Sequence, residues 1–310
     1  MTIPVLIDCD PGHDDAIAIL LALASPEIEL LGITTVAGNS TLPNTTTNAL
    51  KVLELTGRSD VPLAAGAARP LYRELRIAAH VHGESGLDGP ILPKPTLRPA
   101  LVHAVDFLAE KILTSGRPVT LIPIGPLTNV ALLLNRYPEV TANLARIVLM
   151  GGAFEVGNVT PAAEFNIYVD PEAAHRVFHC GIPVTMIGLE VTHKALLNVN
   201  HAEQLRGTGK AGRFVAELLD FFITNYPRHF ELQRAAPIHD AVAVAHVLWP
   251  DLVETIDCYV TIETQSDLCR GRTVADRWNV TGVPANAAIG IGINGERFAR
   301  SLVERLATLD

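Results

Sequence analysis

Short apolar segments alternate with segments of helical periodicity over the first two thirds of the chain. Strands are expected where apolar residues run together, at 3–8, 29–36, 61–63, 119–124, 146–150 and 183–187. Helices are expected where apolar residues recur every three or four positions, at 13–24, 44–56 and 100–114. Because the strands are apolar on both faces, this alternation predicts an α/β fold with an open, mostly parallel, Rossmann-like sheet and helices on both faces.

The last third of the chain is expected to add helices and a few strands to this sheet. Asp170-Pro171-Glu172 has the cap, the proline and the acid that typically begin a helix. Beyond residue 200, helices are expected at 212–225, 240–248 and 295–308, and added strands at 258–263, 272–276 and 287–293. Neither a repeat nor a linker interrupts the pattern, so residues 1–310 are expected to form a single domain.

One long connection, residues 80–99, breaks the rhythm and is rich in glycine and proline. A connection of this length without its own periodicity is often a functional loop. It is equally compatible with a solvated excursion on the surface. The sequence leaves both interpretations open.

An acidic cluster follows the first expected strand and begins the first expected helix. Asp8, Asp10, Asp14 and Asp15 place four carboxylates within eight residues. In open α/β sheets ligands bind beyond the carboxyl ends of the strands, which is where this cluster lies. Four like charges need an opposing charge, and a hard divalent cation, Ca²⁺ or Mg²⁺, supplies it through oxygen ligands. The simpler alternative is that two of the aspartates only cap the helix.

Two further polar groups stand out against apolar surroundings. His239 and Asp240 open a helix, where Asp240 also fits as an ordinary N-cap. Asn158, Glu164 and Asn166 lie in a segment that is otherwise apolar, and they have the chemistry to bind the hydroxyls of a sugar. They are also suited to satisfying the backbone of a loop, and the sequence does not separate the two roles.

Composition narrows the classes of partner. The 310 residues carry 24 Lys and Arg against 33 Asp and Glu, a formal net charge of −9, which argues against a nucleic-acid partner. No basic amphipathic or long apolar segment suggests a membrane, and the first residues do not have the pattern of a secretory leader. The four cysteines form no CxxC pair, which favours reduced thiols in a cytoplasmic protein without a zinc site.

A set of short motifs occurs in a fixed order along essentially the whole chain. They are DCDPGHDDAIAI at 8–19, AGN at 37–39, HGESG at 82–86, GPLTN at 125–129, MGG at 150–152, AEFNIYVDPEAA at 163–174 and HD at 239–240. Together they resemble the nucleoside hydrolases of the inosine–uridine type, and HVHGESGLDGP looks closest to the bacterial pyrimidine-preferring members. The resemblance implies an α/β sheet, a tightly bound Ca²⁺, a homodimer or homotetramer, and hydrolysis of ribonucleosides to ribose and free base.

The resemblance also assigns expected roles to individual residues. The metal ligands would be the carboxylates of Asp10, Asp15 and Asp240 and the backbone carbonyl of Ile124, with Asp8 supporting them from behind. The ribose hydroxyls would be held by Asp14, Asn39, Asn166 and Asp240, and the 5′-hydroxyl by Asn158 and Glu164. The catalytic residues would be Asp10, His239 and His82, with the two histidines near the base.

These roles imply a mechanism. Asp10 is expected to take a proton from a water activated by the cation, while the surrounding carboxylates stabilise an oxocarbenium-like sugar. His239 is the expected acid for the departing base, with His82 as a helper. Tyr226, His229 and Arg234 precede His239 and either close over the base or belong to the ordinary surface.

Two other classes of protein share part of this pattern. Aspartyl-phosphate phosphatases also place DxD after a first strand, although the residues that follow Asp10 do not fit them. A nucleoside-binding or sugar-binding protein with a structural Ca²⁺ would bind the same ligands without turnover. Both remain open as minor alternatives.

Overall fold

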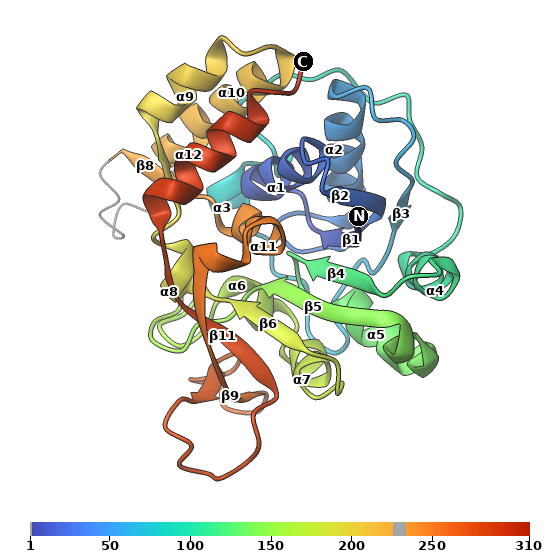
Figure 1. The fold of residues 1–310 in the computed structure, drawn as a ribbon, viewed down its shortest axis with the longest axis vertical. Coiled ribbons are helices and arrows are strands. Elements are labelled where there is room, and N and C mark those ends of the chain that lie inside the picture. Colours follow the sequence, from blue (N-terminus) through green and yellow to red (C-terminus); the bar gives the residue numbers. More distant parts are fainter. Residues whose placement is uncertain (1, 226–233) are drawn as a thin grey trace.

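The computed structural model describes residues 2–225 and 234–310. Nine strands form one sheet in the order β10-β9-β11-β6-β5-β4-β1-β2-β3 (Figure 1). The strands are β1 (Ile3–Cys9), β2 (Ile28–Thr35), β3 (Leu63–Ala65), β4 (Val119–Pro123), β5 (Leu144–Met150), β6 (Val184–Ile187), β9 (Val253–Ile262), β10 (Thr273–Asp276) and β11 (Ala287–Ile293). The expectation of a mostly parallel α/β sheet is confirmed. Within this nine-stranded sheet, β9 pairs antiparallel with β10 and β11, and the other pairs are parallel.

Helices cover both faces of the sheet. One layer holds α1 (His13–Leu23), α2 (Leu42–Leu55), α9 (Val199–Arg206), α10 (Lys210–Asn225), α11 (His239–Leu248) and α12 (Gly295–Leu306). The opposite layer holds α4 (Ala104–Thr114), α5 (Thr128–Arg136) and α7 (Pro171–Phe178), which lie below the sheet in Figure 1. Each layer buries its own apolar cluster against the sheet, so the strands are covered on both sides.

Short elements complete the connections. They are the helices α3 (Ala79–His82), α6 (Phe165–Val169) and α8 (Leu189–Thr192), the 3₁₀ helices at Pro138–Asn143 and Pro250–Leu252, and the strands β7 (Leu196–Asn198) and β8 (Ala235–Pro237). β7 and β8 pair antiparallel and bring the chain to the start of α11.

Helix α1 is apolar around its whole circumference because other helices surround it. Its residues from His13 to Ala22 are buried, and it packs against α11, α2, α10 and α12. This burial explains the continuous run from Ala16 to Leu23, which is not an amphipathic pattern. The helix therefore holds its first turn, with Asp14 and Asp15, in a fixed place relative to the sheet.

Residues 80–99 divide into two parts. The first part is packed, since α3 ends with the buried His82 and Leu87 lies in the core. The second part runs extended over the surface, where Ile91 is almost fully exposed. The surface excursion expected from the sequence therefore describes the second half of the connection, and the functional role of the packed first half stays a prediction.

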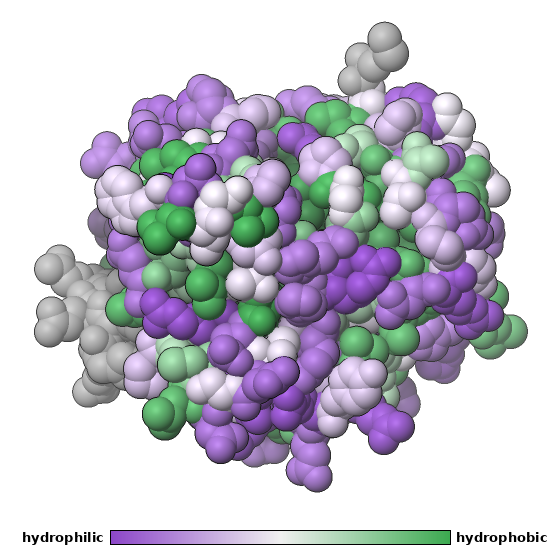
Figure 2. All heavy atoms as spheres, turned by 90° about the horizontal axis from the view of Figure 1, so that it is seen from below, coloured by the Kyte–Doolittle hydropathy of each residue, from purple (hydrophilic) through white to green (hydrophobic). Residues whose placement is uncertain are grey.

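The surface mixes hydrophilic and hydrophobic residues. Figure 2 views the molecule from the end at which β9 and β10 lie in Figure 1, and shows the two kinds interspersed. Exposed apolar side chains of the connections beside these strands include Leu268, Trp278 and Val280. Within residues 2–225 and 234–310, no helix is long and apolar enough to cross a membrane.

Candidate active site

The site lies where parallel strands end side by side. β1 pairs in parallel with β2 and β4, with Asp8 opposite Thr34 on one side and Pro123 on the other. A cavity of about 330 Å³ opens beyond these strand ends. Most of the residues expected from the sequence line it, namely Asp14, Asn39, His82, Ile124, Asn158, Glu164, Asn166, His239 and Asp240. Asp10 and Asp15 are fully buried beside this wall.

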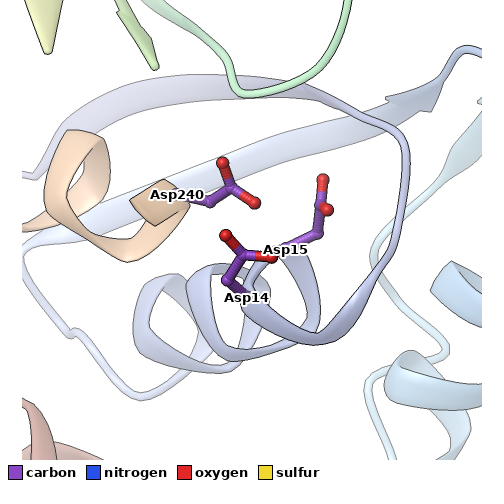
Figure 3. Close-up of side chains that lie close together, drawn as sticks. All are labelled: Asp14, Asp15 and Asp240. Carbon is purple, nitrogen blue, oxygen red and sulfur yellow. The ribbon is translucent and has the colours of Figure 1, made fainter. Parts of the chain in front are cut away.

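Two helix starts bring three carboxylates together. Asp14 and Asp15 extend from the first turn of α1, and Asp240 from the first turn of α11, and their carboxylates face one another (Figure 3). One oxygen from each lies within 4.8 Å of the others. The positive ends of two helices favour negative charge at this point. Asp240 does not act as the N-cap of α11, since that position belongs to Ile238.

Asp15 closes the turn between β1 and α1. Its Oδ1 accepts a hydrogen bond from the backbone N–H of Asp10 at 3.0 Å, and its Oδ2 accepts one from Gly12 N–H at 2.9 Å. The side-chain amide of Asn39 donates to the same Oδ2 at 3.1 Å. Asp15 therefore shapes the loop that holds the other aspartates, in addition to facing the cluster.

Asp10 is only half satisfied. Its Oδ2 accepts a hydrogen bond from the backbone N–H of Asn39 at 2.6 Å, whereas its buried Oδ1 has no hydrogen-bond partner among the described residues. Asp8 shows the same asymmetry within residues 2–225 and 234–310, because Oδ1 accepts from Thr34 and Asn129 while Oδ2 accepts from none of these residues. A buried carboxylate oxygen without a partner is costly, so each of these atoms is suited to an electropositive ligand.

The carboxylates of the cluster resist ionisation. Burial, which disfavours the charged form, raises the pKa of Asp8 and that of Asp14 to about 7. Burial, followed by repulsion from neighbouring aspartates, raises the pKa of Asp10 and of Asp240 well above the ordinary value. Burial also raises the pKa of Asp15, against hydrogen bonds that lower it. A hard cation with oxygen ligands would offset this repulsion, and the donor set is of the type that such cations take.

The amide of Asn166 links two strand ends. Its Nδ2 donates to the carbonyl oxygen of Ile124 at 3.0 Å and to that of Met150 at 3.2 Å. These residues follow β4 and end β5, so their carbonyl groups meet at one edge of the cavity. The Ile124 carbonyl, the expected backbone ligand, therefore lies against a side chain that was itself expected to bind ribose.

Glu164 and Asn158 both hold backbone. Glu164 is the N-cap of α6, with Oε1 accepting from Asn166 N–H and Oε2 from Gly152 N–H, each at 2.9 Å. Asn158 Oδ1 accepts from Phe165 N–H at 3.0 Å. Burial raises the pKa of Glu164. The loop-satisfying role is therefore present, and both residues also line the cavity.

The two expected histidines are buried at the cavity wall. Burial is the main cause that lowers the pKa of His82 and of His239 well below the ordinary value. His239 Nδ1 lies 2.7 Å from Thr192 Oγ1, and His82 Nδ1 lies 3.0 Å from His13 Nδ1. Both imidazoles are therefore expected to be neutral near pH 7, a state in which a ring nitrogen offers a hydrogen bond and not a charge.

Of the three weaker candidates near the base, Arg234 lies among the described residues. Tyr226 and His229 lie outside the described residues. Arg234 is exposed, has a positive φ of 61°, and is not among the described residues that line the cavity.

Several site residues were not expected from the sequence. Asn129 donates from Nδ2 to Asp8 Oδ1 at 2.8 Å and to the Thr35 carbonyl at 3.0 Å, which connects α5 to the ends of β1 and β2 behind the cluster. Its only sequence signal is the end of the GPLTN segment. The apolar wall of the cavity is formed by Val81, Val159, Phe165 and Phe222. A polar floor and an apolar wall suit a ligand with a polyhydroxyl part and a flat ring.

Comparison with known proteins agrees with this geometry. Residues 5–300 match the family model described as inosine-uridine preferring nucleoside hydrolase. The chain is 54% identical over 308 residues to the pyrimidine-specific ribonucleoside hydrolase RihA of Shewanella sp. (strain ANA-3), covering 99% of this chain and 97% of that protein. It is 52% identical to a protein of the same description from Citrobacter koseri, covering 99% of each.

A solved structure shows the same fold. The purine-preferring ribonucleoside hydrolase from Gardnerella vaginalis has a TM-score of 0.92 and 33% identity, with 98% of each chain covered. The family resemblance inferred from the motifs is confirmed by these comparisons.

Proposed function

Since the chain belongs to the inosine–uridine preferring nucleoside hydrolase family, we propose that it hydrolyses the N-glycosidic bond of pyrimidine ribonucleosides such as uridine and cytidine, to ribose and free base. The observation that carries this proposal is a cavity in which acidic and amide side chains face an apolar, partly aromatic wall. The preference for pyrimidines is supported by relatives at 52–54% identity that are described as pyrimidine-specific.

We propose that the site binds Ca²⁺ through the carboxylates of Asp10, Asp15 and Asp240 and the carbonyl of Ile124. The support is the unpartnered Asp10 Oδ1 and the convergence of carboxylates at two helix starts. The convergence of Asp14, Asp15 and Asp240 differs from this set, with Asp14 in the place of Asp10. When bound, the cation supplies Lewis acidity that lowers the pKa of a water and orients vicinal hydroxyls.

The sugar is held by the polar floor of the cavity. Asp14, Asn39, Asn166 and Asp240 bind the 2′- and 3′-hydroxyls, since each lines the cavity with a carboxylate or an amide. Asn158 and Glu164 bind the 5′-hydroxyl. Their oxygens already accept backbone N–H groups, and a carbonyl or carboxylate oxygen has a second lone pair for a hydroxyl donor.

Asp10 is the proposed general base. Its Oδ2 is held by Asn39 N–H, which fixes the carboxylate and leaves Oδ1 to take the proton of the attacking water. As the bond to the base lengthens, positive charge develops on the ribose ring, and the surrounding carboxylates stabilise it. Water then adds to C1′ and the base departs.

The departing base is assisted by hydrogen bonds. His239 and His82 are the proposed partners because both line the cavity. With both imidazoles neutral, the assistance is a hydrogen bond to the base as negative charge develops on it. Full proton transfer would require the bound substrate to raise the pKa of one imidazole.

The direct test is ribose release from uridine. The purified protein is incubated with uridine, cytidine, inosine and 2′-deoxyuridine, and free sugar is measured as a reducing group. We expect faster release from uridine and cytidine than from inosine, and little from 2′-deoxyuridine, since it lacks one hydroxyl that the site holds. Equal rates for uridine and 2′-deoxyuridine would contradict recognition of the diol.

The same assay separates the two alternative classes. Phosphate release from uridine monophosphate without ribose release from uridine would indicate a phosphatase. Saturable uridine binding by calorimetry without turnover would indicate a binding protein. We also propose that the chain forms a homodimer or homotetramer, which light scattering coupled to gel filtration measures directly.

A further inference from the structure

His13 is a buried histidine that the proposed mechanism does not use. It is the first residue of α1 and is not among the residues that line the cavity. Its ring nevertheless touches the site through His82, because His13 Nδ1 lies 3.0 Å from His82 Nδ1. The backbone N–H of His13 points to the same nitrogen at 3.3 Å. Two polar groups of one residue therefore meet the Nδ1 edge of His82.

The other side of the His13 ring is anchored as well. His13 Nε2 lies 2.8 Å from the carbonyl oxygen of Asp88. A carbonyl oxygen only accepts, so Nε2 carries a proton and donates it there. Asp88 belongs to the turn after α3, where its carboxylate accepts from Glu84 N–H and Ser85 N–H. His13 therefore connects the first turn of α1 to the loop that follows His82.

Aromatic packing fixes the plane of the His13 ring. The ring stacks on Phe221 with centroids 5.1 Å apart and an interplanar angle of 7°, and on Phe222 at 5.3 Å and 18°. It also stacks on His82 at 5.3 Å and 26°. A ring held by stacking and by both nitrogens has little freedom to turn.

Gly12 allows the close approach of the two histidines. A Cβ atom at this position would lie 2.6 Å from His82 Nδ1 and 2.7 Å from its Cε1, which is closer than atoms approach without displacement. The Nδ1 edge of His82 is therefore packed against the turn between β1 and α1. Nε2 is the ring nitrogen of His82 that makes no hydrogen bond with the residues described here, and His82 lines the cavity.

We propose that His13 is a positioning residue that holds the His82 ring with Nε2 directed to the substrate cavity, where Nε2 donates a hydrogen bond to the departing base. For Nε2 to carry that proton, Nδ1 of the neutral His82 must accept, so the proton between the two Nδ1 atoms lies on His13, which then donates through both of its ring nitrogens. This inference rests on the proposed function and specifies how one of its groups is oriented. It also predicts that His13 affects only reactions in which the base needs help to leave.

The test compares two substrates that differ in their leaving group. Uridine has a poor leaving group, whereas p-nitrophenyl β-riboside releases a stable phenolate without assistance. His13→Leu replaces the ring by an apolar side chain of similar size and so removes both ring nitrogens. We expect kcat for uridine to fall roughly 10- to 100-fold with little change in KM, and kcat for the nitrophenyl riboside to stay within about 3-fold.

Conservative variants provide matched controls. The amide of His13→Asn lies near the place of Nδ1 and can again contact His82, so this variant should recover much of the uridine activity. The amide of His13→Gln lies near the place of Nε2 and should not recover it. Far-UV circular dichroism and the thermal midpoint establish that each variant folds.

A double-substitution cycle tests whether His13 acts through His82. In a His82→Leu background, adding His13→Leu should cause no further loss of uridine turnover. Additive losses, or equal losses for both substrates, would overturn the proposal and leave His13 with a packing role only.

Failure of the proposed function is recognised separately, as a wild-type protein that releases ribose from neither substrate. The positioning is then tested by ¹⁵N NMR of the His82 ring. Its resonances should change in His13→Leu and return toward the wild-type values in His13→Asn. Unchanged resonances in His13→Leu would overturn the positioning by itself.

Discussion

The Asp10 carboxylate shows how a single residue can be unfavourable for folding and useful for chemistry. One oxygen is hydrogen-bonded, and the other is buried without a partner among the described residues. Burial, and after it repulsion from neighbouring aspartates, raises the pKa of this carboxyl group. Such an arrangement is not what stability alone would select. The proposed function accounts for this arrangement, because a cation and the attacking water would both approach the free oxygen of Asp10.

Asp10→Asn should therefore separate activity from stability. The amide oxygen can still accept from Asn39 N–H, but the group has lost its charge and its basicity. We expect kcat for uridine to fall by at least about 100-fold. In the presence of a chelator the variant should melt at a higher temperature than the wild type, since one repelling charge is gone. Thermal scans and ribose assays measure both effects.

The matched control is Asp267→Asn, a change of the same type at an exposed position. It should leave both quantities unchanged. An Asp10→Asn protein with more than a tenth of the wild-type kcat would show that Asp10 is not the base.

Residue types were predictable here, whereas their partners were not. The four clustered aspartates predict a cation site at the end of a strand from their residue type and spacing alone. Asn129 and the carbonyl of Ile124 carry no such signal, because an asparagine is common in loops and every residue has a carbonyl group. Their roles follow from neighbouring parallel strands, which only the folded sheet brings together.

Among the elements, α1 and α11 determine the geometry of the site. They pack against each other and present their first turns to the same cavity. A carboxylate at a helix start is stabilised by the helix dipole, so the two helices together offset part of the repulsion between the like charges. Seen alone in the sequence, Asp240 has the pattern of an ordinary cap.

Helix α11 also carries His246, whose properties predict a pH effect away from the site. Burial lowers the pKa of His246 to about 4, and its Nδ1 has no hydrogen-bond partner in the part of the chain that the structure describes. The unfolded state binds a proton near pH 6.5, whereas the folded state binds it only near 4. Stability contributed by the neutral ring is therefore present above pH 6.5 and is lost as the pH falls toward 4.

His246→Gln removes this titration. Between pH 7 and pH 4.5, the wild type should lose roughly 2 kcal/mol more unfolding free energy than the variant. Urea unfolding followed by circular dichroism at the two pH values gives the difference. Identical losses in the two proteins would show that His246 does not contribute.

Glu190 supports the loop that follows β5. Its Oε1 accepts hydrogen bonds from Phe154 N–H at 3.0 Å and Glu155 N–H at 2.9 Å, close to the segment that carries Asn158. Glu190→Ala removes the acceptor, so kcat/KM for uridine should fall roughly 10-fold through a misplaced loop. Glu190→Gln keeps a carbonyl acceptor and should stay near the wild type. Steady-state kinetics of the pair tests this, and equal losses in both would point to the charge instead.

The order of helices and strands was largely predictable, and the deviations have local causes. The helix expected at 100–114 begins at Ala104, because His103 caps it and Ala100 instead pairs with Ala64 beside β3. Helix α5 was not expected, since its nine residues lie between a Gly-Pro turn and Pro138 and are few for a helical pattern to be recognised. The strands at 3–8 and 287–293 were predicted well because they are apolar and bounded by turns.

At the scale of the whole molecule, the acidic cluster couples stability to pH, and with the proposed cation it would couple stability to metal as well. In the absence of a cation, the pKa of Asp8 and of Asp14 is raised by burial to about 7, above the value of an unfolded chain. The stability linked to these groups is present at low pH and is lost as the pH rises through 7. A cation needs the ionised ligands, so its effect has the opposite trend.

Calcium should therefore raise the thermal midpoint more at pH 8 than at pH 5. The quantity to measure is the midpoint with Ca²⁺ minus the midpoint with a chelator, at each pH, because this difference cancels groups remote from the site. Potassium at equal ionic strength serves as the control. A calcium effect that is absent, or equal at both pH values, would contradict the proposed ligand set.

The sheet order also has a consequence for how the chain is made. β1 lies between β2 and β4, yet it precedes both in the chain, and β4 begins only at Val119. During synthesis one edge of β1 stays unpaired until β4 has left the ribosome, and the aspartates after β1 lack the facing Asp240 for far longer. We therefore expect the growing chain to expose an open sheet edge until β4 has been translated, and its carboxylate cluster to stay incomplete until α11 has followed.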